Sequence, residues 1–277
     1  SGKDLVNGGA LYNSSGASFL AYPDVCDSLV AIEQTVFIDK KYSFAEIKEA
    51  IQNNFEGKEE IRLFLKNKTA KFGNEDEIAV RTSRKLVKDI YEILQSKKNY
   101  RGGTYRPAFW TMTTHAGQGK LAGAMPSGRK AKEVFSSGIT PSSQAAPDLI
   151  GAFNAVAKLD NKKIPGGWAL NIKYSPINGN VDKETYLKKF GDMIESFFRK
   201  GGMQVQFNIQ DYKTLIDAKE NPEKYPEMIV RVSGYSAYFK DLSAAMKDEL
   251  ITRTQYNLIS GQSVELPDKY EQTIEIK

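Results

Sequence analysis

The feature that most constrains the fold is a change of hydrophobic pattern near Tyr100. Before it, apolar residues recur at helical spacing in four segments, which predicts four amphipathic helices. After it, short apolar runs that suit buried strands alternate with amphipathic helical segments. Strands that alternate with helices are typical of an α/β sheet or barrel. We therefore expect an α/β fold, with the first hundred residues packed as helices outside the sheet.

The hydrophobic pattern predicts the residue range of each helix and strand. Helices are predicted at residues 24–36, 43–57, 58–68, 75–97, 148–158, 183–200, 212–221 and 242–255. Strands are predicted at residues 108–114, 168–174, 203–209 and 229–232, with weak strand character at 272–277. Apart from the strand at 108–114, the Gly-, Pro-, Ser- and Thr-rich stretch 101–147 is expected to form ordered loops, because it carries too many apolar residues for disorder.

Composition excludes several kinds of site. Cys26 is the single cysteine and His115 the single histidine, so an internal disulfide, a multi-His or Cys-rich metal cluster and a hydrolase triad with a spare His are all disfavoured. The net charge of +5 is spread over interleaved charges of both signs, without the basic stripe of a nucleic-acid interface. No signal-peptide pattern and no run of about 18 apolar residues is present, so neither secretion nor a membrane span is expected. We expect a cytoplasmic protein.

Gly234 lies between Ser233 and Tyr235 at the end of an apolar strand. Taken alone, a glycine in this position is typical of a turn that needs a positive φ. Its surroundings suggest a second role, because glycine is also the one residue whose α-carbon can become a planar, delocalised radical without a Cβ crowding the plane. Such a radical would need a dry, shielded loop.

An ordered series of segments from about Asp4 to Thr254 resembles the glycyl radical enzymes of the pyruvate formate-lyase-like and glycerol dehydratase-like branch. The segments are 4–10 (Asp-Leu-Val-Asn-Gly-Gly-Ala), 24–29 (Asp-Val-Cys-Asp-Ser-Leu), 101–107 (Arg-Gly-Gly-Thr-Tyr-Arg-Pro), 126–131 (Pro-Ser-Gly-Arg-Lys-Ala), 138–142 (Gly-Ile-Thr-Pro-Ser), 201–208 (Gly-Gly-Met-Gln-Val-Gln-Phe-Asn) and the radical signature at 231–239 (Arg-Val-Ser-Gly-Tyr-Ser-Ala-Tyr-Phe).

The resemblance implies a fold and a mechanism. It implies the C-terminal half of a ten-stranded α/β barrel with peripheral helices, in which Gly234 stores a radical installed by a radical-SAM activating enzyme. The radical would generate a thiyl on a catalytic Cys, which attacks a small-molecule substrate. The resemblance also implies an oxygen-sensitive, anaerobic enzyme with no bound cofactor or metal, homodimeric at full length.

The catalytic Cys of this family lies in a loop upstream of the Asn-Gly-Gly-Ala segment with which this chain begins. Cys26 stands at a helix start, where the family usually has Ala, so we expect a buried structural thiol. The chain also opens on Ser1 rather than Met, and we expect it to be part of a longer enzyme. Within it we assign residues 1–200 to the barrel, 201–255 to the glycine-radical domain and 256–277 to a polar tail.

The candidate site residues fall into two groups. Arg231, Ser233, Tyr235 and Ser236 are expected to hold the radical loop, and Gln204, Gln206, Asn208 and His115 are candidates for the barrel interior. The three polar residues at 204, 206 and 208 alternate with apolar ones and should share one face of their strand. Phe109 and Trp110 are expected in the core.

Two functions remain open at this stage. The first is the radical-bearing part of a glycyl radical lyase, dehydratase or decarboxylase that cleaves C–C, C–O or C–N bonds and is inactive without the rest of the enzyme. The second is a naturally split or spare-part subunit that docks on a partner supplying the catalytic Cys. Phe109 and Trp110 leave an aryl or alkyl substrate open.

Overall fold

The computed structural model describes residues 2–142, 145–175, 182–257 and 262–265. The helices are α1 (Tyr22–Ile32), α2 (Phe44–Gln52), α3 (Glu59–Asn67), α4 (Glu77–Gln95), α5 (Thr114–Leu121), α6 (Leu149–Ala157), α7 (Lys183–Arg199), α8 (Tyr212–Glu220) and α9 (Ala244–Thr252). The strands are β1 (Ser15–Ser18), β2 (Tyr105–Ala108), β3 (Asn171–Tyr174), β4 (Gln206–Asn208), β5 (Ile229–Arg231), β6 (Ser236–Tyr238), β7 (Gln255–Tyr256) and β8 (Ser263–Val264).

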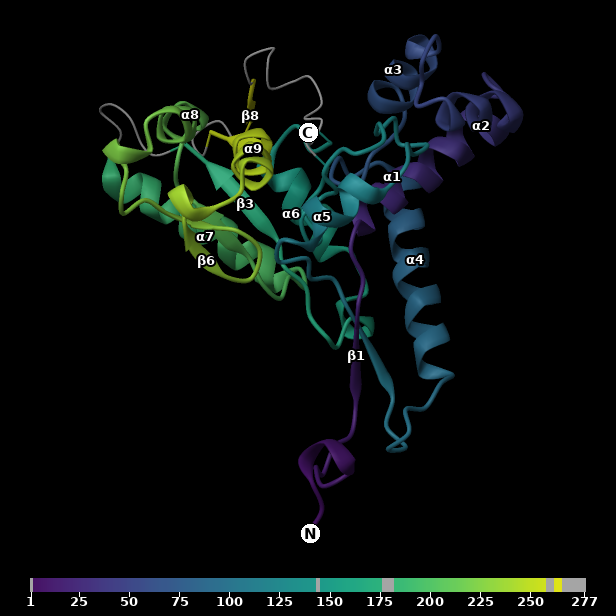
Figure 1. Cartoon of the computed structure of the whole chain (residues 1–277), viewed down its shortest axis with the longest axis vertical. Helices are drawn as coiled ribbons and strands as arrows, with labels where there is room; N and C mark the ends of the chain where they lie inside the picture. Colours follow the sequence, from purple (N-terminus) through teal and green to yellow (C-terminus); the bar gives the residue numbers. More distant parts are fainter. Residues whose placement is uncertain (1, 143–144, 176–181, 258–261, 266–277) are drawn as a thin grey trace.

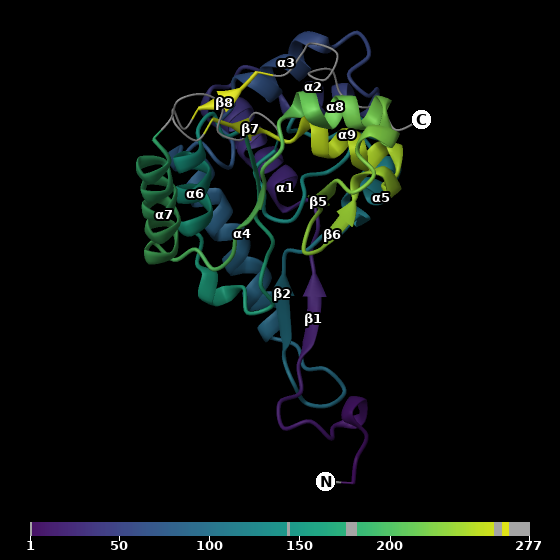
Figure 2. The same cartoon turned by 90° about the vertical axis from the view of Figure 1, so that its left-hand side faces the viewer.

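A narrow arm projects from a broader body (Figure 1). The arm contains β1, β2 and the loops beyond them, and α4 runs along it. In the body, α2 and α3 form one corner, while α6 to α9 surround β3 on the other side (Figures 1 and 2). The helical part of the first hundred residues therefore lies outside the sheet, as the sequence predicts.

The central strands run parallel. β1 pairs with β2 from Ser15↔Tyr105 to Ser18↔Ala108. A parallel bridge between Phe109 and Trp168 then connects the end of β2 to the residues just before β3. β3 then pairs in parallel with β4 on one side and β7 on the other, and β8 joins β7 antiparallel. Helices cross over between parallel strands, which is the α/β arrangement.

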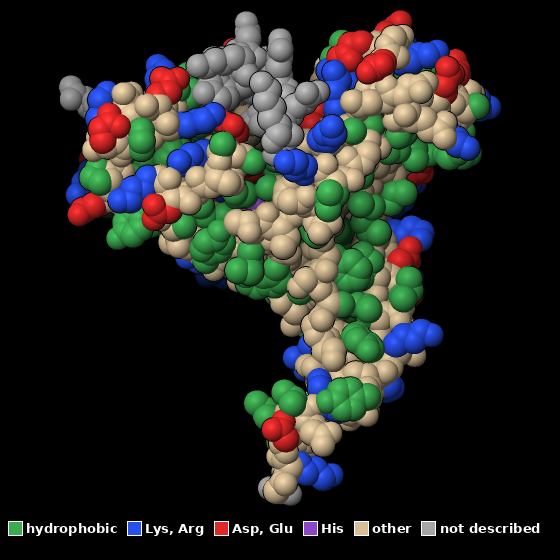
Figure 3. Space-filling model, in the orientation of Figure 1, with side chains coloured by type: hydrophobic (Ala, Val, Ile, Leu, Met, Phe, Trp, Pro, Cys, Tyr) green, Lys and Arg blue, Asp and Glu red, His purple; other side chains and the backbone are tan. Residues whose placement is uncertain are grey.

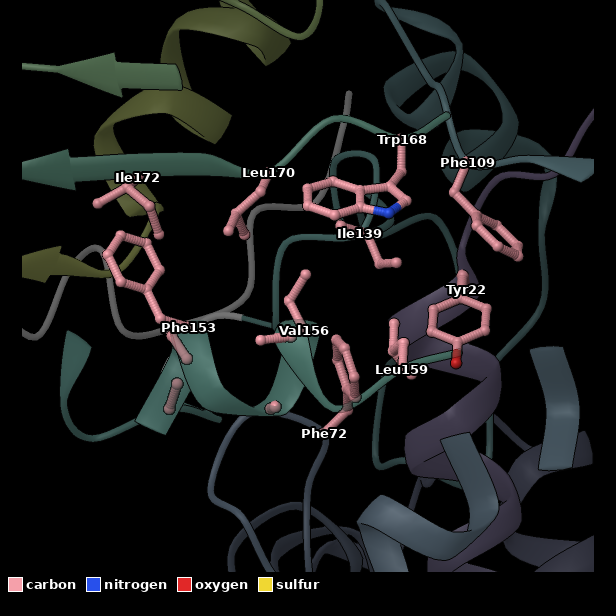
Figure 4. Packing of buried hydrophobic residues seen from close by; sticks show 14 of the residues in the cluster. Tyr22, Phe72, Phe109, Ile139, Phe153, Val156, Leu159, Trp168, Leu170 and Ile172 are labelled. Atoms are coloured by element: carbon pink, nitrogen blue, oxygen red, sulfur yellow. The ribbon is translucent and has the colours of Figure 1, made fainter. Parts of the chain in front are cut away.

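Alternation along β3 separates an apolar face from a polar one. Leu170 and Ile172 point toward α6, where Phe153 and Val156 meet them in the largest buried cluster (Figure 4). The Phe153 ring stacks on Phe197 of α7 at a centroid distance of 4.6 Å. The opposite face of β3 carries Asn171 and Lys173, which are also buried, and it is this polar face that meets the C-terminal elements.

Most predicted elements are confirmed within a few residues, including the Ser43–Glu46 capping box at α2. Two predictions between residues 101 and 147 are wrong. The strand is Tyr105–Ala108 rather than 108–114, because the chain turns at Met112 (φ 47°) and Thr114 N donates to Thr111 O at 2.7 Å. The helix α5 replaces a predicted loop. Its glycines obscure its helical pattern, and at Gly119 a Cβ would stand 2.3 Å from the Glu133 carbonyl oxygen.

Two further predictions concern the C-terminal part of the chain. The predicted helix 242–255 ends at Thr252, and Gln255 belongs to β7. The weak strand predicted at 272–277 lies outside the described residues. Within the part of the chain that the structure describes, each helix is too short or too polar to cross a bilayer.

Candidate functional site

Gly234 lies at the tip of the hairpin formed by β5 and β6. The strands pair up to Arg231↔Ser236, and Val232 N donates to Tyr235 O at 2.9 Å to close the four-residue turn. Gly234 has φ +85°, a conformation in which any L-residue is strained. The expected positive-φ turn is therefore present, and the backbone itself requires glycine at this position. In Figure 2 the hairpin points toward the end of β2.

The indole of Trp110 lies against Gly234. A Cβ built on Gly234 would stand 3.2 Å from Cζ3 and 3.3 Å from Cε3 of the indole. Trp110 Nε1 donates to Gly166 O at 2.9 Å, which fixes the ring at its other end. The prediction that Trp110 is a core residue is wrong, because its exposed fraction is 36%. Phe109 is fully buried, as predicted. Trp110 follows β2, where the chain has left the sheet and no longer alternates.

Two side chains of β4 bind the hairpin. Asn208 forms a pair of bonds with the backbone of Arg231: Oδ1 accepts from its N–H and Nδ2 donates to its carbonyl, both at 2.7 Å. Gln206 Oε1 accepts from Arg231 Nε at 2.6 Å and from Gly234 N at 3.3 Å. Gln204 does not join them. It precedes the strand, and its Oε1 accepts from Leu170 N at 2.9 Å.

The four residues expected to hold the loop have different surroundings. Ser233 is fully buried, and its Oγ accepts a bond from Thr111 Oγ1 at 3.2 Å. Arg231 donates from Nη1 to Ser236 Oγ at 3.1 Å across the hairpin. Tyr235 packs against the apolar cluster formed by α8, α9 and the hairpin. Each of these contacts restrains the loop around Gly234.

A polar network lies directly below the hairpin. Thr111 Oγ1 also accepts from Gly138 N at 3.0 Å, and Asn171 Nδ2 donates to Ser137 Oγ at 3.2 Å. Asn171 Oδ1 in turn accepts from Gln206 Nε2, which fixes the orientation of the Gln206 amide. Sequence reasoning missed Asn171, although it alternates with apolar residues in β3 as Gln206 does in β4.

His115 lies beneath α9 rather than beside the radical loop. It is fully buried, and its Nε2 is 3.7 Å from Glu249 Oε1. Glu249 also accepts from Arg253 Nε at 2.7 Å and Nη2 at 2.8 Å. Burial opposes ionisation of Glu249, but Arg253 and His115 outweigh it and lower its pKa to about 2. The same arginine donates from Nη1 to Arg231 O at 3.4 Å, so this buried cluster reaches the hairpin.

Lys173 connects the sheet to α9. Its Nζ donates to the carbonyls of Leu250 at 3.1 Å and Ile251 at 2.6 Å, in the last turn of the helix, where a cation is favoured. Burial, reinforced by the charge of Arg253, lowers the pKa of Lys173 from 10.5 to about 7. A lysine that alternates with apolar residues in a buried strand is a signal that sequence reasoning missed.

The described chain does not seal Gly234. The glycine is exposed, so the dry surroundings expected for a radical are not provided by these residues alone. Figure 3 shows apolar side chains gathered on this face of the body and along the arm. Exposed apolar residues near the hairpin include Trp110, Met112, Ile229 and Tyr238.

Cys26 is not part of the site. It is fully buried in α1, and its Sγ lies 4.0 Å from Ala79 O in α4. Burial raises the pKa of this thiol well above its usual value. The described residues also contain no group of three or more His, Cys, Asp or Glu side chains arranged to hold a metal ion.

Comparison with known proteins assigns the family. The model described as "Pyruvate formate lyase-like" matches residues 1–119, and the model described as "Glycine radical" matches residues 135–240, which include the Gly234 hairpin. The chain belongs to the glycyl radical enzyme family. It is 35% identical over 257 residues to trans-4-hydroxy-L-proline dehydratase of Clostridioides difficile, and 32% identical over 284 residues to indoleacetate decarboxylase of Tractidigestivibacter scatoligenes.

These alignments cover 92% and 93% of this chain but 32% of each relative. The chain therefore spans about a third of the length of the curated glycyl radical enzymes that it matches. Among solved structures, the glycerol-bound B12-independent glycerol dehydratase from Clostridium butyricum superimposes with a TM-score of 0.84 at 35% identity, covering 90% of this chain and 31% of that one. The relatives include dehydratases, a decarboxylase and lyases.

Proposed function

We propose that this chain is the radical-bearing part of a glycyl radical lyase, dehydratase or decarboxylase, with Gly234 as the residue that stores the radical. The observation that supports this most strongly is the position of Gly234. It lies at the tip of a hydrogen-bonded hairpin, in a conformation that only glycine adopts easily, inside the region that matches the glycine-radical family.

The surroundings of Gly234 suit this role. Removal of one α-hydrogen leaves an electron delocalised between the amide nitrogen and the carbonyl of the glycine. Delocalisation requires a planar α-carbon, and the bonds from Gln206, Asn208 and Thr111 would hold the loop in place around it. In this proposal Arg231, Ser233, Tyr235 and Ser236 support the loop, while His115 supports it indirectly through Glu249 and Arg253.

The catalytic thiol is proposed to come from outside this sequence, since Cys26 is buried between α1 and α4. Residues 1–200 would then form part of a ten-stranded barrel, with 201–255 as the glycine-radical domain. Within the described residues β1 and β4 are edge strands, so strands from elsewhere in the enzyme can continue the sheet at both. We further propose a homodimeric, cytoplasmic enzyme that is activated by a radical-SAM enzyme and acts on a small molecule.

The test is electron paramagnetic resonance after anaerobic activation. The chain, together with the polypeptide that carries the thiol, is incubated with a radical-SAM activating enzyme, S-adenosylmethionine and a reductant. We expect a doublet from coupling to the remaining α-hydrogen of Gly234, and backbone cleavage at Gly234 on exposure to air. Gly234→Ala should abolish both.

Gly191→Ala is the matched control, because a Cβ on Gly191 of α7 meets nothing within 4 Å. A doublet that survives Gly234→Ala, or one that Gly191→Ala removes, would contradict the assignment. If the thiol-bearing polypeptide is encoded separately from this chain rather than in frame with it, the protein is the split or spare-part subunit instead.

A further inference from the structure

Trp110 lies where a parallel sheet usually places a bound molecule. β1 and β2 are parallel and end side by side at Ser18↔Ala108, so the chain leaves the sheet at its carboxyl end just before Trp110. Ligands of parallel sheets usually bind outside the carboxyl ends of the strands. The indole also borders Gly234, where a Cβ would stand 3.2 Å from its Cζ3. Trp110 therefore belongs to the region where the proposed reaction would take place.

The indole is held in position by the segment after α6. Its Nε1 donates to Gly166 O at 2.9 Å, and a Cβ on Gly167 would stand 3.3 Å from its Cζ2. Gly167 has φ +78°, so its backbone approaches the ring in a conformation that favours glycine. Because the protein itself binds the polar atom of the indole, the ring can offer another molecule its hydrocarbon and π surface.

A substantial part of this ring is accessible. The exposed fraction of Trp110 is 36%, and because the benzo edge of the indole borders Gly234, the exposed part lies within one ring width of that glycine. Met112, two residues further along the chain, has an exposed fraction of 57%. Small-molecule sites are lined mainly by apolar and aromatic side chains of this kind. The ring therefore has the properties of a wall of a binding site.

The polar side chains around Gly234 are bound to the protein itself. Both ends of the Asn208 amide bind the backbone of Arg231. Both ends of the Gln206 amide are bound within the polar network below the hairpin. The Thr111 hydroxyl donates one bond at 3.2 Å and accepts another at 3.0 Å. Since these groups are occupied, the contact that Trp110 offers beside Gly234 is apolar.

The charge nearest to this surface along the hairpin is positive. Arg231 Nε and the Gly234 N–H bind the same Gln206 oxygen, at 2.6 and 3.3 Å. Arg231 Nη1 also donates to Ser236 Oγ at 3.1 Å, and both of these acceptors are neutral. The guanidinium therefore disfavours a cationic ligand beside Gly234, although the face of an indole would otherwise attract one.

On the basis of the proposed function, we propose that Trp110 contacts the substrate and sets specificity, with its indole packed against an uncharged aromatic ring of the substrate beside Gly234. An aromatic ring is favoured over an aliphatic one, because aromatic pairs gain interaction beyond their buried area. The fixed position of the indole adds to this preference, since the side chain does not have to be ordered when the ligand binds.

Fluorobenzene is the probe, because it is an uncharged aromatic ring with a fluorine label and no weak C–H bond for a radical to attack. Its binding to the complete, unactivated enzyme is measured by fluorine magnetic resonance, with fluorocyclohexane and 2-fluoroethanol as aliphatic and polar comparisons. We expect fluorobenzene to bind about threefold or more tightly than either. Trp110→Leu should weaken its binding by about fivefold or more, and Trp110→Phe, which keeps an aromatic ring, by no more than about twofold.

A second measurement locates the bound probe. When Gly234 carries the radical, the electron spin should speed the relaxation of a fluorine nucleus bound nearby, and Trp110→Leu should remove this effect. Phe44→Ala is the matched control. It removes an exposed aromatic ring at the start of α2, in the corner of the body formed by α2 and α3, and should change neither the affinity nor the relaxation (Figure 1).

Several results would overturn the inference. Fluorobenzene and fluorocyclohexane would bind equally well, or Trp110→Leu would leave the affinity unchanged, or Trp110→Phe would lose as much affinity as Trp110→Leu. Absence of binding would also overturn it, and is expected if the thiol-bearing polypeptide covers Trp110. A radical doublet without faster fluorine relaxation would do the same. The affinities are measured without a radical, so a missing doublet refutes the proposed function separately.

Discussion

Replacement of Glu249 by Gln should weaken the attachment of α9 and the hairpin to the rest of the protein. The carboxylate is buried and accepts two bonds from Arg253, with His115 at 3.7 Å. The fall of its pKa from 4.5 to about 2 corresponds to roughly 3 kcal/mol of stability at neutral pH. Removing one partner of a buried ion pair typically costs about 3–5 kcal/mol, which agrees.

The pH dependence has a definite sign. The pKa of Glu249 is lower in the folded protein than in the unfolded chain, so its contribution is complete above the unfolded pKa of about 4.5 and is lost as the pH falls toward 2. The difference in unfolding free energy between wild type and Glu249→Gln should therefore shrink from about 3 kcal/mol at pH 7 to about 1 kcal/mol at pH 3.

Urea denaturation followed by tryptophan fluorescence at both pH values measures this difference. Asp248→Asn is the control, because Asp248 lies next to Glu249 in α9 and pairs with Lys219 of α8, and both side chains of this pair are partly exposed. It should cost no more than about 1 kcal/mol at pH 7. The reasoning is refuted if the two variants cost the same at pH 7, or if the effect of Glu249→Gln does not depend on pH.

Three further perturbations test other contacts of the site. Gln206→Leu leaves the Gly234 N–H without its acceptor and should lower the free energy of unfolding by about 1–3 kcal/mol. Hydrogen exchange of the hairpin amides should become faster, and an unchanged exchange rate would contradict the prediction. Thr111→Val removes the donor to the buried Ser233 hydroxyl and should cost about 1 kcal/mol in denaturation, whereas no loss would mean that water replaces the bond. The pKa of Lys173 is about 7 in the folded protein and 10.5 in the unfolded chain, so the free energy of unfolding should rise between pH 7 and 10. Lys173→Met should flatten that rise. If the unfolding free energies of wild type and variant depend on pH in the same way, the lowered pKa of Lys173 is disproved.

The sequence predicts the site best where alternation is regular. Gln206 and Asn208 share a strand face with a strict period of two, and both bind the hairpin. Gln204 fits the same pattern but lies before the strand begins, so its side chain turns to β3. Strand ends depend on pairing with distant residues, and a local pattern contains no information about that pairing.

Trp110 shows a second reason why the sequence does not predict the whole site. An aromatic residue after Phe109 is expected in the core, but the turn at Met112 takes the chain out of the sheet and directs the ring toward Gly234. Arg253 lies at the end of a predicted helix, where a surface position is the usual expectation, yet it is buried through its pair with Glu249. Both positions depend on contacts with segments more than a hundred residues away: Trp110 lies against Gly234, and Arg253 Nη2 is 3.4 Å from Ser137 Oγ.

The split of the apolar core has a consequence for cooperativity. Within the described residues, the cluster of α8, α9 and the hairpin shares no member with the larger cluster around β3 and α6. Polar bonds such as those of Lys173, Asn208 and Thr111 cross between them. Opening such a boundary exposes less apolar surface than opening a continuous core. The hairpin unit should therefore unfold as a separate foldon, at a lower free energy than the β3 sheet.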